Sequence, residues 1–145
     1  MFGAPEADIA VTAFLLHLVW EFWQAPWYQG MSDMPHLQGI LLCSRAAFGD
    51  AFIALLAYGT LAAYTRDRYW AAKASPSQVA GYVGVGLAVT IVLEWLATAV
   101  LDRWQYAASM PTVPLLGTGL APLLQWLIVP LAVLGWIRRV WNLRR

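Results

Sequence analysis

The sequence predicts an all-α integral membrane protein, a single domain (residues 1–145) folded as a polytopic four-helix bundle. Of its 145 residues, 61% are hydrophobic and 12% are charged, whereas soluble domains usually carry about 25% charged residues. Four apolar stretches approach the roughly 20 residues that a helix needs to cross a bilayer. Their length and their lack of strict alternation argue against strands.

The four expected spans cover about residues 9–27, 46–64, 79–101 and 115–137. The second and third are separated by TRDRYWAAKASPSQ, which contains charges and a proline. The third and fourth are separated by DRWQYAASMPTVP. We expect small residues on the third span (Ala80, Gly84 and Ala88) to pack against a neighbouring helix. Pro122 and Pro130 are expected to bend the fourth.

Basic residues predict the orientation of these spans. They follow the second and fourth spans, in the set Arg66, Arg68, Lys73, Arg138, Arg139, Arg144 and Arg145. With four spans, these two segments lie on the same side as the N-terminus. We therefore expect both termini to be cytoplasmic, and the membrane to be a bacterial inner membrane.

Each expected span contains polar residues. On the first, His17, Trp20, Glu21, Gln24 and Trp27 fall within about one-third of the helix circumference, at about 100° per residue. A charged side chain in mid-bilayer costs about 2.5–3.5 kcal/mol on insertion scales, so this face should point inward.

The other three spans contribute polar groups to the same half of the membrane. These groups are Asp50 in the second span, Glu94 in the third and Gln125 in the fourth. The topology predicts that His17, Glu21, Asp50, Glu94 and Gln125 meet in one layer. Acidic and imidazole groups removed from water are suited to proton exchange near neutral pH.

Simpler interpretations exist for each residue. His17 and Glu21 could be a hydrogen-bonded pair that joins helices, and Asp50 could cap its helix or pair with Arg45. His36 is expected at the surface. Cys43 is the single cysteine, and HLVWE is not the HExxH motif of metalloproteases, so the metal signal is weak. We expect no metal, no cofactor and no nucleic-acid partner.

The string HLVWEFW (residues 17–23) resembles a stretch of the EXPERA group, which includes the sterol Δ8–Δ7 isomerase and the sigma-2 receptor. QWLIVP (residues 125–130) is similar to the last helix of the isomerase, with Gln125 standing for an Asn. The resemblance implies a four-helix membrane bundle that acts on, or binds, a sterol-like or terpenoid lipid.

The implied chemistry is cofactor-independent isomerisation or cyclisation of a lipid alkene. Glu21 would donate the proton, His17 would assist it, and Asp50 would shuttle a proton or stabilise charge, with Glu94 a fourth catalytic candidate. The candidates for substrate binding are Trp20, Gln24, Trp95, Gln125 and Trp126, and the indoles would stabilise a carbocation by cation–π attraction.

Two other functions stay open on the sequence alone. The protein could bind a lipid or cationic amphiphile without turnover, or it could be an accessory subunit of a larger membrane complex. Membrane lipids and a hydrophobic substrate are the expected partners, and the sequence leaves a homodimer open.

Overall fold

The computed structural model describes residues 4–143, which form helices and connecting loops without a β-strand. The α-helices are α1 (Pro5–Gln24), α2 (His36–Thr65), α3 (Pro76–Trp95) and α4 (Leu120–Leu143). Two short 3₁₀ turns, η1 (Ala25–Trp27) and η2 (Trp70–Lys73), follow α1 and α2, and a π-helical turn, η3 (Leu96–Val100), continues α3. The all-α prediction is confirmed for this part of the chain; the expected basic residues Arg144 and Arg145 lie outside it.

Three of the four helices are long and apolar enough to cross a membrane: α2, α3 extended by η3, and α4. Helix α1 is as long as α3 but more polar, because it carries the acids Glu6, Asp8 and Glu21. A membrane protein is therefore supported by three helices of the described chain.

Two helix boundaries differ from those expected. Helix α2 begins at His36, ten residues before the expected start, because the segment 36–45 is itself apolar at helical spacing and adds almost three turns. Helix α4 begins at Leu120 and not near residue 115. There Leu115 and Gly117 have φ angles of 74° and 66°, which a right-handed helix does not accommodate.

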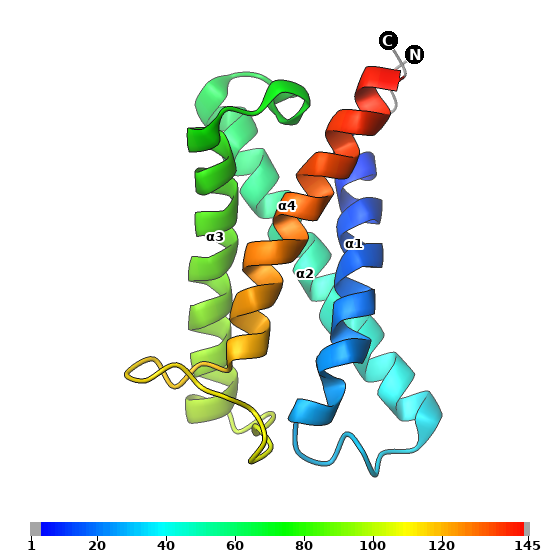
Figure 1. Ribbon diagram of the computed structural model, residues 1–145, viewed down its shortest axis with the longest axis vertical. Coiled ribbons are helices and arrows are strands. Elements are labelled where there is room, and N and C mark those ends of the chain that lie inside the picture. Colours follow the sequence, from blue (N-terminus) through cyan, green and yellow to red (C-terminus); the bar gives the residue numbers. More distant parts are fainter. Residues whose placement is uncertain (1–3, 144–145) are drawn as a thin grey trace.

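The helices form a bundle in which α4 crosses in front of α2 and between α1 and α3 (Figure 1). Helix α1 packs on α2 and α4, and α3 packs on the same two helices. The two chain ends and the α2–α3 loop lie at one end of the bundle, and the α1–α2 and α3–α4 loops lie at the other (Figure 1). The second end is the one that carries the polar residues of interest.

Small residues set the close approach of the helices. Helix α2 buries a series of alanines, Ala47, Ala51, Ala54 and Ala57. On α3 the prediction of a packing face at Ala80, Gly84 and Ala88 is wrong, since all three are exposed. The buried face consists of Tyr82, Gly86, Thr90 and Glu94. These residues recur every four positions like the predicted set, so the spacing alone could not choose between the two faces.

Gly86 marks the tightest contact between α3 and α4. A Cβ atom built there would lie 2.0 Å from Cε3 of Trp126, which is fully buried. Only glycine therefore lets the Trp126 indole approach α3 this closely. Pro122 lies in the first turn of α4, where a missing amide hydrogen costs little, and Pro130 lies inside the helix.

Candidate functional site

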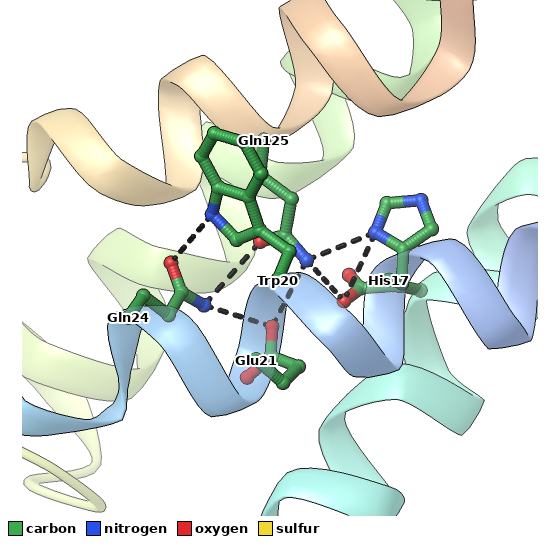
Figure 2. A network of polar contacts seen from close by, with 6 residues as sticks. His17, Trp20, Glu21, Gln24 and Gln125 are labelled. Atoms are coloured by element: carbon green, nitrogen blue, oxygen red, sulfur yellow. Dashed lines mark hydrogen bonds and ion pairs between the residues drawn. The ribbon is translucent and has the colours of Figure 1, made fainter. Parts of the chain in front are cut away.

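One face of α1 presents His17, Glu21 and Gln24 to the interior of the bundle (Figure 2). The spacings of four and three residues place them on adjacent turns. His17 is fully buried and Gln24 is 3% exposed. A helix that buries these side chains must offer them polar partners, because each unpaired buried group is costly.

Gln125 of α4 is the common partner. Its Nε2 atom lies 2.9 Å from His17 Nδ1, 3.0 Å from Glu21 Oε1 and 2.9 Å from Asp50 Oδ2. Figure 2 shows the Gln125 side chain reaching from α4 toward the α1 residues. Since Asp50 belongs to α2, one amide nitrogen joins three helices.

A second amide orients the first. Gln24 Nε2 donates to Glu21 Oε1 at 2.8 Å and to Gln125 Oε1 at 3.4 Å, and Trp20 Nε1 donates to Gln24 Oε1 at 3.2 Å. Because Gln125 Oε1 accepts from Gln24, the amide nitrogen of Gln125 is the end that faces the titratable groups. The two glutamines thus order the cluster His17–Glu21–Asp50–Gln125, which we call the acid–imidazole cluster.

Gln125 Nε2 has more potential hydrogen-bond acceptors around it than it has hydrogens to donate. An amide nitrogen carries two hydrogens and cannot donate to three neighbours at once. His17 Nδ1 also lies 3.4 Å from Asp50 Oδ2, with both side chains largely buried. A proton held by the imidazole or by a carboxyl group supplies the missing donor. The arrangement is therefore suited to hold one proton and to exchange it among three groups.

The imidazole of His17 also contacts an aromatic ring, the indole of Trp126. The ring centroids of His17 and Trp126 are 5.0 Å apart. Within the described chain, His17 Nε2 and Trp126 Nε1 are buried and have no hydrogen-bond partner. Unpaired buried nitrogens are uncommon in folded proteins and call for an explanation.

Glu94 lies in a second group at the same end of the bundle. Its Oε2 atom accepts hydrogen bonds from the hydroxyl of Tyr106 and, at 3.4 Å, from Trp104 Nε1. Burial and the bond to Glu94 raise the pKa of Tyr106, so its hydroxyl stays protonated and donates. Glu94 interacts with the acid–imidazole cluster electrostatically, through Asp50. It thus anchors the α3–α4 loop to the bundle.

The loop carrying Tyr106 was not predicted to contribute. Tyr106 also forms an isolated bridge with Tyr28, and their ring centroids are 5.6 Å apart. Cys43 also lies beside the acid–imidazole cluster, since its Sγ donates to the backbone carbonyl of Glu21 at 3.7 Å. A loop has no periodicity from which the direction of its side chains could be read, so the sequence offered no signal for Tyr106.

The remaining predicted residues separate into two groups. Trp20, Gln24, Gln125 and Trp126 adjoin the acid–imidazole cluster. Trp95 does not: it is 55% exposed on α3. His36 is exposed, as expected, and Asp50 contacts His17 and Gln125, not Arg45. Across residues 4–143, no three His, Cys, Asp or Glu side chains are grouped to hold a metal ion.

Comparison of the chain with protein-family models, curated proteins and solved structures finds no match.

Proposed function

We propose that the protein is a membrane-embedded isomerase or cyclase that protonates a double bond of a hydrophobic, terpenoid or sterol-like lipid. The observation that carries the proposal is the position of Gln125 Nε2, within 3.0 Å of His17, Glu21 and Asp50 from two other helices. A buried site that holds an exchangeable proton beside indole rings is suited to this chemistry and requires no cofactor. The resemblance to the EXPERA group is consistent with it.

In the proposed reaction, the Glu21 carboxylic acid gives its proton to one carbon of the alkene, and the π electrons form the new C–H bond. The adjacent carbon becomes a cation, which the faces of Trp20 and Trp126 stabilise. Asp50 or His17 then removes a proton from the next carbon, and those C–H electrons form the shifted double bond. The proton returns to Glu21 within the cluster, so the enzyme ends unchanged.

Cyclisation begins with the same protonation. The cation would then be captured by a second double bond of the same lipid before a proton is lost. His17 Nε2 and Trp126 Nε1, which are buried without a hydrogen-bond partner in residues 4–143, would be available to a polar group of such a lipid. Glu94, bound to Tyr106, would keep the loop closed over this end of the bundle and limit access of water.

We further propose that α1 is a fourth span, with both termini in the cytoplasm of a bacterium and the bundle in its inner membrane. The start of α1 and the end of α4 lie at the same end of the bundle (Figure 1), which supports a fourth crossing by α1 beside the other helices. The polar face of α1 is turned to the interior, and its outer face carries exposed apolar residues such as Val11, Leu15 and Val19.

The test uses purified protein in nanodiscs, in deuterated buffer, with squalene and a Δ8-sterol as probes. Protonation from an exchangeable acid places deuterium on a carbon of the recovered lipid, which mass spectrometry detects. Glu21→Gln keeps the size of the side chain but removes the acidic proton. It should lower deuterium incorporation into the lipid by about 100-fold or more.

Glu6→Gln is the matched control, because it is the same substitution on the same helix. Glu6 is partly exposed and pairs with Arg68 at the bundle surface, so its loss should not alter turnover. Equal incorporation by Glu21→Gln and the parent protein would exclude Glu21 as the donor. A probe that binds tightly without any deuterium uptake would identify a binding protein and not an enzyme.

A further inference from the structure

The outer surface of the bundle has a groove between α3 and α4, at the end that carries the termini. It has a volume of about 470 Å³ and is lined by the N-terminal half of α3 and by α4, through Ala74, Pro76, Val79, Ala80, Val83, Leu127, Leu131 and Arg138. All but Arg138 are apolar. Leu127 and Leu131 are 43% and 52% exposed, so the groove opens toward the surroundings of the bundle.

Arg138 closes the groove at its polar end. The guanidinium donates from Nη2 to the Ala74 carbonyl, just before α3 begins. Its Nε atom is buried without a partner in the described chain, and Arg138 forms no ion pair with any residue of 4–143. A cation that is bound to a backbone carbonyl beside apolar surface and has no ion-pair partner favours an anionic ligand.

The acids at this end are engaged with other groups. Glu6 binds Arg68 through two contacts of 2.7 Å, Asp8 accepts from Trp141 Nε1 at 2.8 Å, and Asp67 accepts from the Tyr69 amide at 2.7 Å. The same end of the bundle carries five basic residues, compared with these three acids: Arg66, Arg68, Lys73, Arg138 and Arg139. Positive charges therefore outnumber negative ones at this end within residues 4–143, and none of these three acids forms an ion pair with Arg138.

We propose that this groove binds one anionic phospholipid, with an acyl chain along Val79, Val83 and Leu131 and the phosphate against Arg138. The positive end of the α3 helix dipole lies beside the same position and favours the phosphate. This site is separate from the acid–imidazole cluster, and its occupant is a lipid of the surrounding membrane and not the substrate.

The experiment is native mass spectrometry of the full chain released from detergent, after equilibration with phosphatidylglycerol or phosphatidylcholine of identical acyl chains. We expect one phosphatidylglycerol to be retained in preference to phosphatidylcholine. Arg138→Gln should weaken that retention by about fivefold or more, as expected for loss of one interfacial cation. Arg139→Gln removes the same charge from a neighbouring position that does not line the groove, and should weaken it less.

A second variant tests the apolar part of the site. Ala80→Phe adds a ring within the groove at an exposed position, where it does not disturb the bundle core, and should reduce retention of both lipids. The proposal is overturned if both lipids are retained equally, or if Arg139→Gln weakens retention as much as Arg138→Gln. It is also overturned if millimolar inorganic phosphate displaces the lipid, because the site would then recognise the anion alone.

Discussion

At the scale of single residues, the proposed chemistry depends on a neutral side chain. Gln125 is 2% exposed and contributes no charge, yet its amide is the point where groups from α1 and α2 meet. An arginine there would fix the carboxyls as anions, and an apolar residue would leave them without a donor. The amide holds the three groups together, and in the proposed reaction it leaves the proton free to move among them.

Replacing Gln125 by Leu should therefore destabilise the protein and abolish turnover. The change leaves His17, Glu21 and Asp50 without their shared donor, and each buried polar group that loses its partner costs about 1–3 kcal/mol. Unfolding in mixed micelles, followed by circular dichroism, measures the loss. Thr118→Val is a control of similar shape, since the buried Thr118 hydroxyl has no partner within the described chain and its removal should be close to neutral. Equal stability of Gln125→Leu and the parent would contradict the role of the amide.

At the scale of helices, α3 positions the site by approaching α4 closely. The buried residues of α3 recur every four positions, and Gly86 provides the space that Trp126 occupies. Trp126 in turn packs against the His17 ring. The glycine on one helix thus determines where an aromatic residue of a second helix meets an imidazole of a third.

Gly86→Ala tests this contact. The added methyl group would overlap Trp126, so the helices must separate or the indole must move, with a cost of about 1–3 kcal/mol for overpacking. Gly84→Ala makes the same change two residues earlier, where nothing lies within 4 Å, and should be neutral or slightly stabilising. Tryptophan fluorescence together with thermal unfolding distinguishes the two variants. If they behaved alike, the close packing at Gly86 would not be what holds Trp126.

At the scale of the whole molecule, charge and polarity are divided between the two ends of the bundle. The end with the termini carries most of the basic residues, and the other end carries the acid–imidazole cluster and the loop bound to Glu94. If α1 spans the membrane and both termini are cytoplasmic, the cluster lies in the half of the membrane that is farther from the cytoplasm. Lipid would then approach the cluster from within the bilayer.

Cysteine labelling checks this topology. In a Cys43→Ser background, Lys73→Cys and Ser109→Cys place one thiol in each exposed loop at opposite ends of the bundle. A membrane-impermeant maleimide added to intact cells should label position 109 and leave position 73 unlabelled until the cells are opened. The reverse pattern would contradict the orientation. A cysteine added before Pro5 should behave like position 73, and its labelling in intact cells would mean that α1 does not cross.

The sequence by itself determined the helical class and three of the membrane-length helices, because these follow from local apolar runs and helical spacing. It also predicted that five polar residues would meet, and the structure brings together four of them, His17, Glu21, Asp50 and Gln125, but not Glu94. The tertiary structure decided which face of α3 is buried, placed Trp95 at the surface, and paired Glu94 with Tyr106. Those outcomes depend on helix rotation and on a loop that folds back over the bundle, and both are set by contacts between segments distant in the chain.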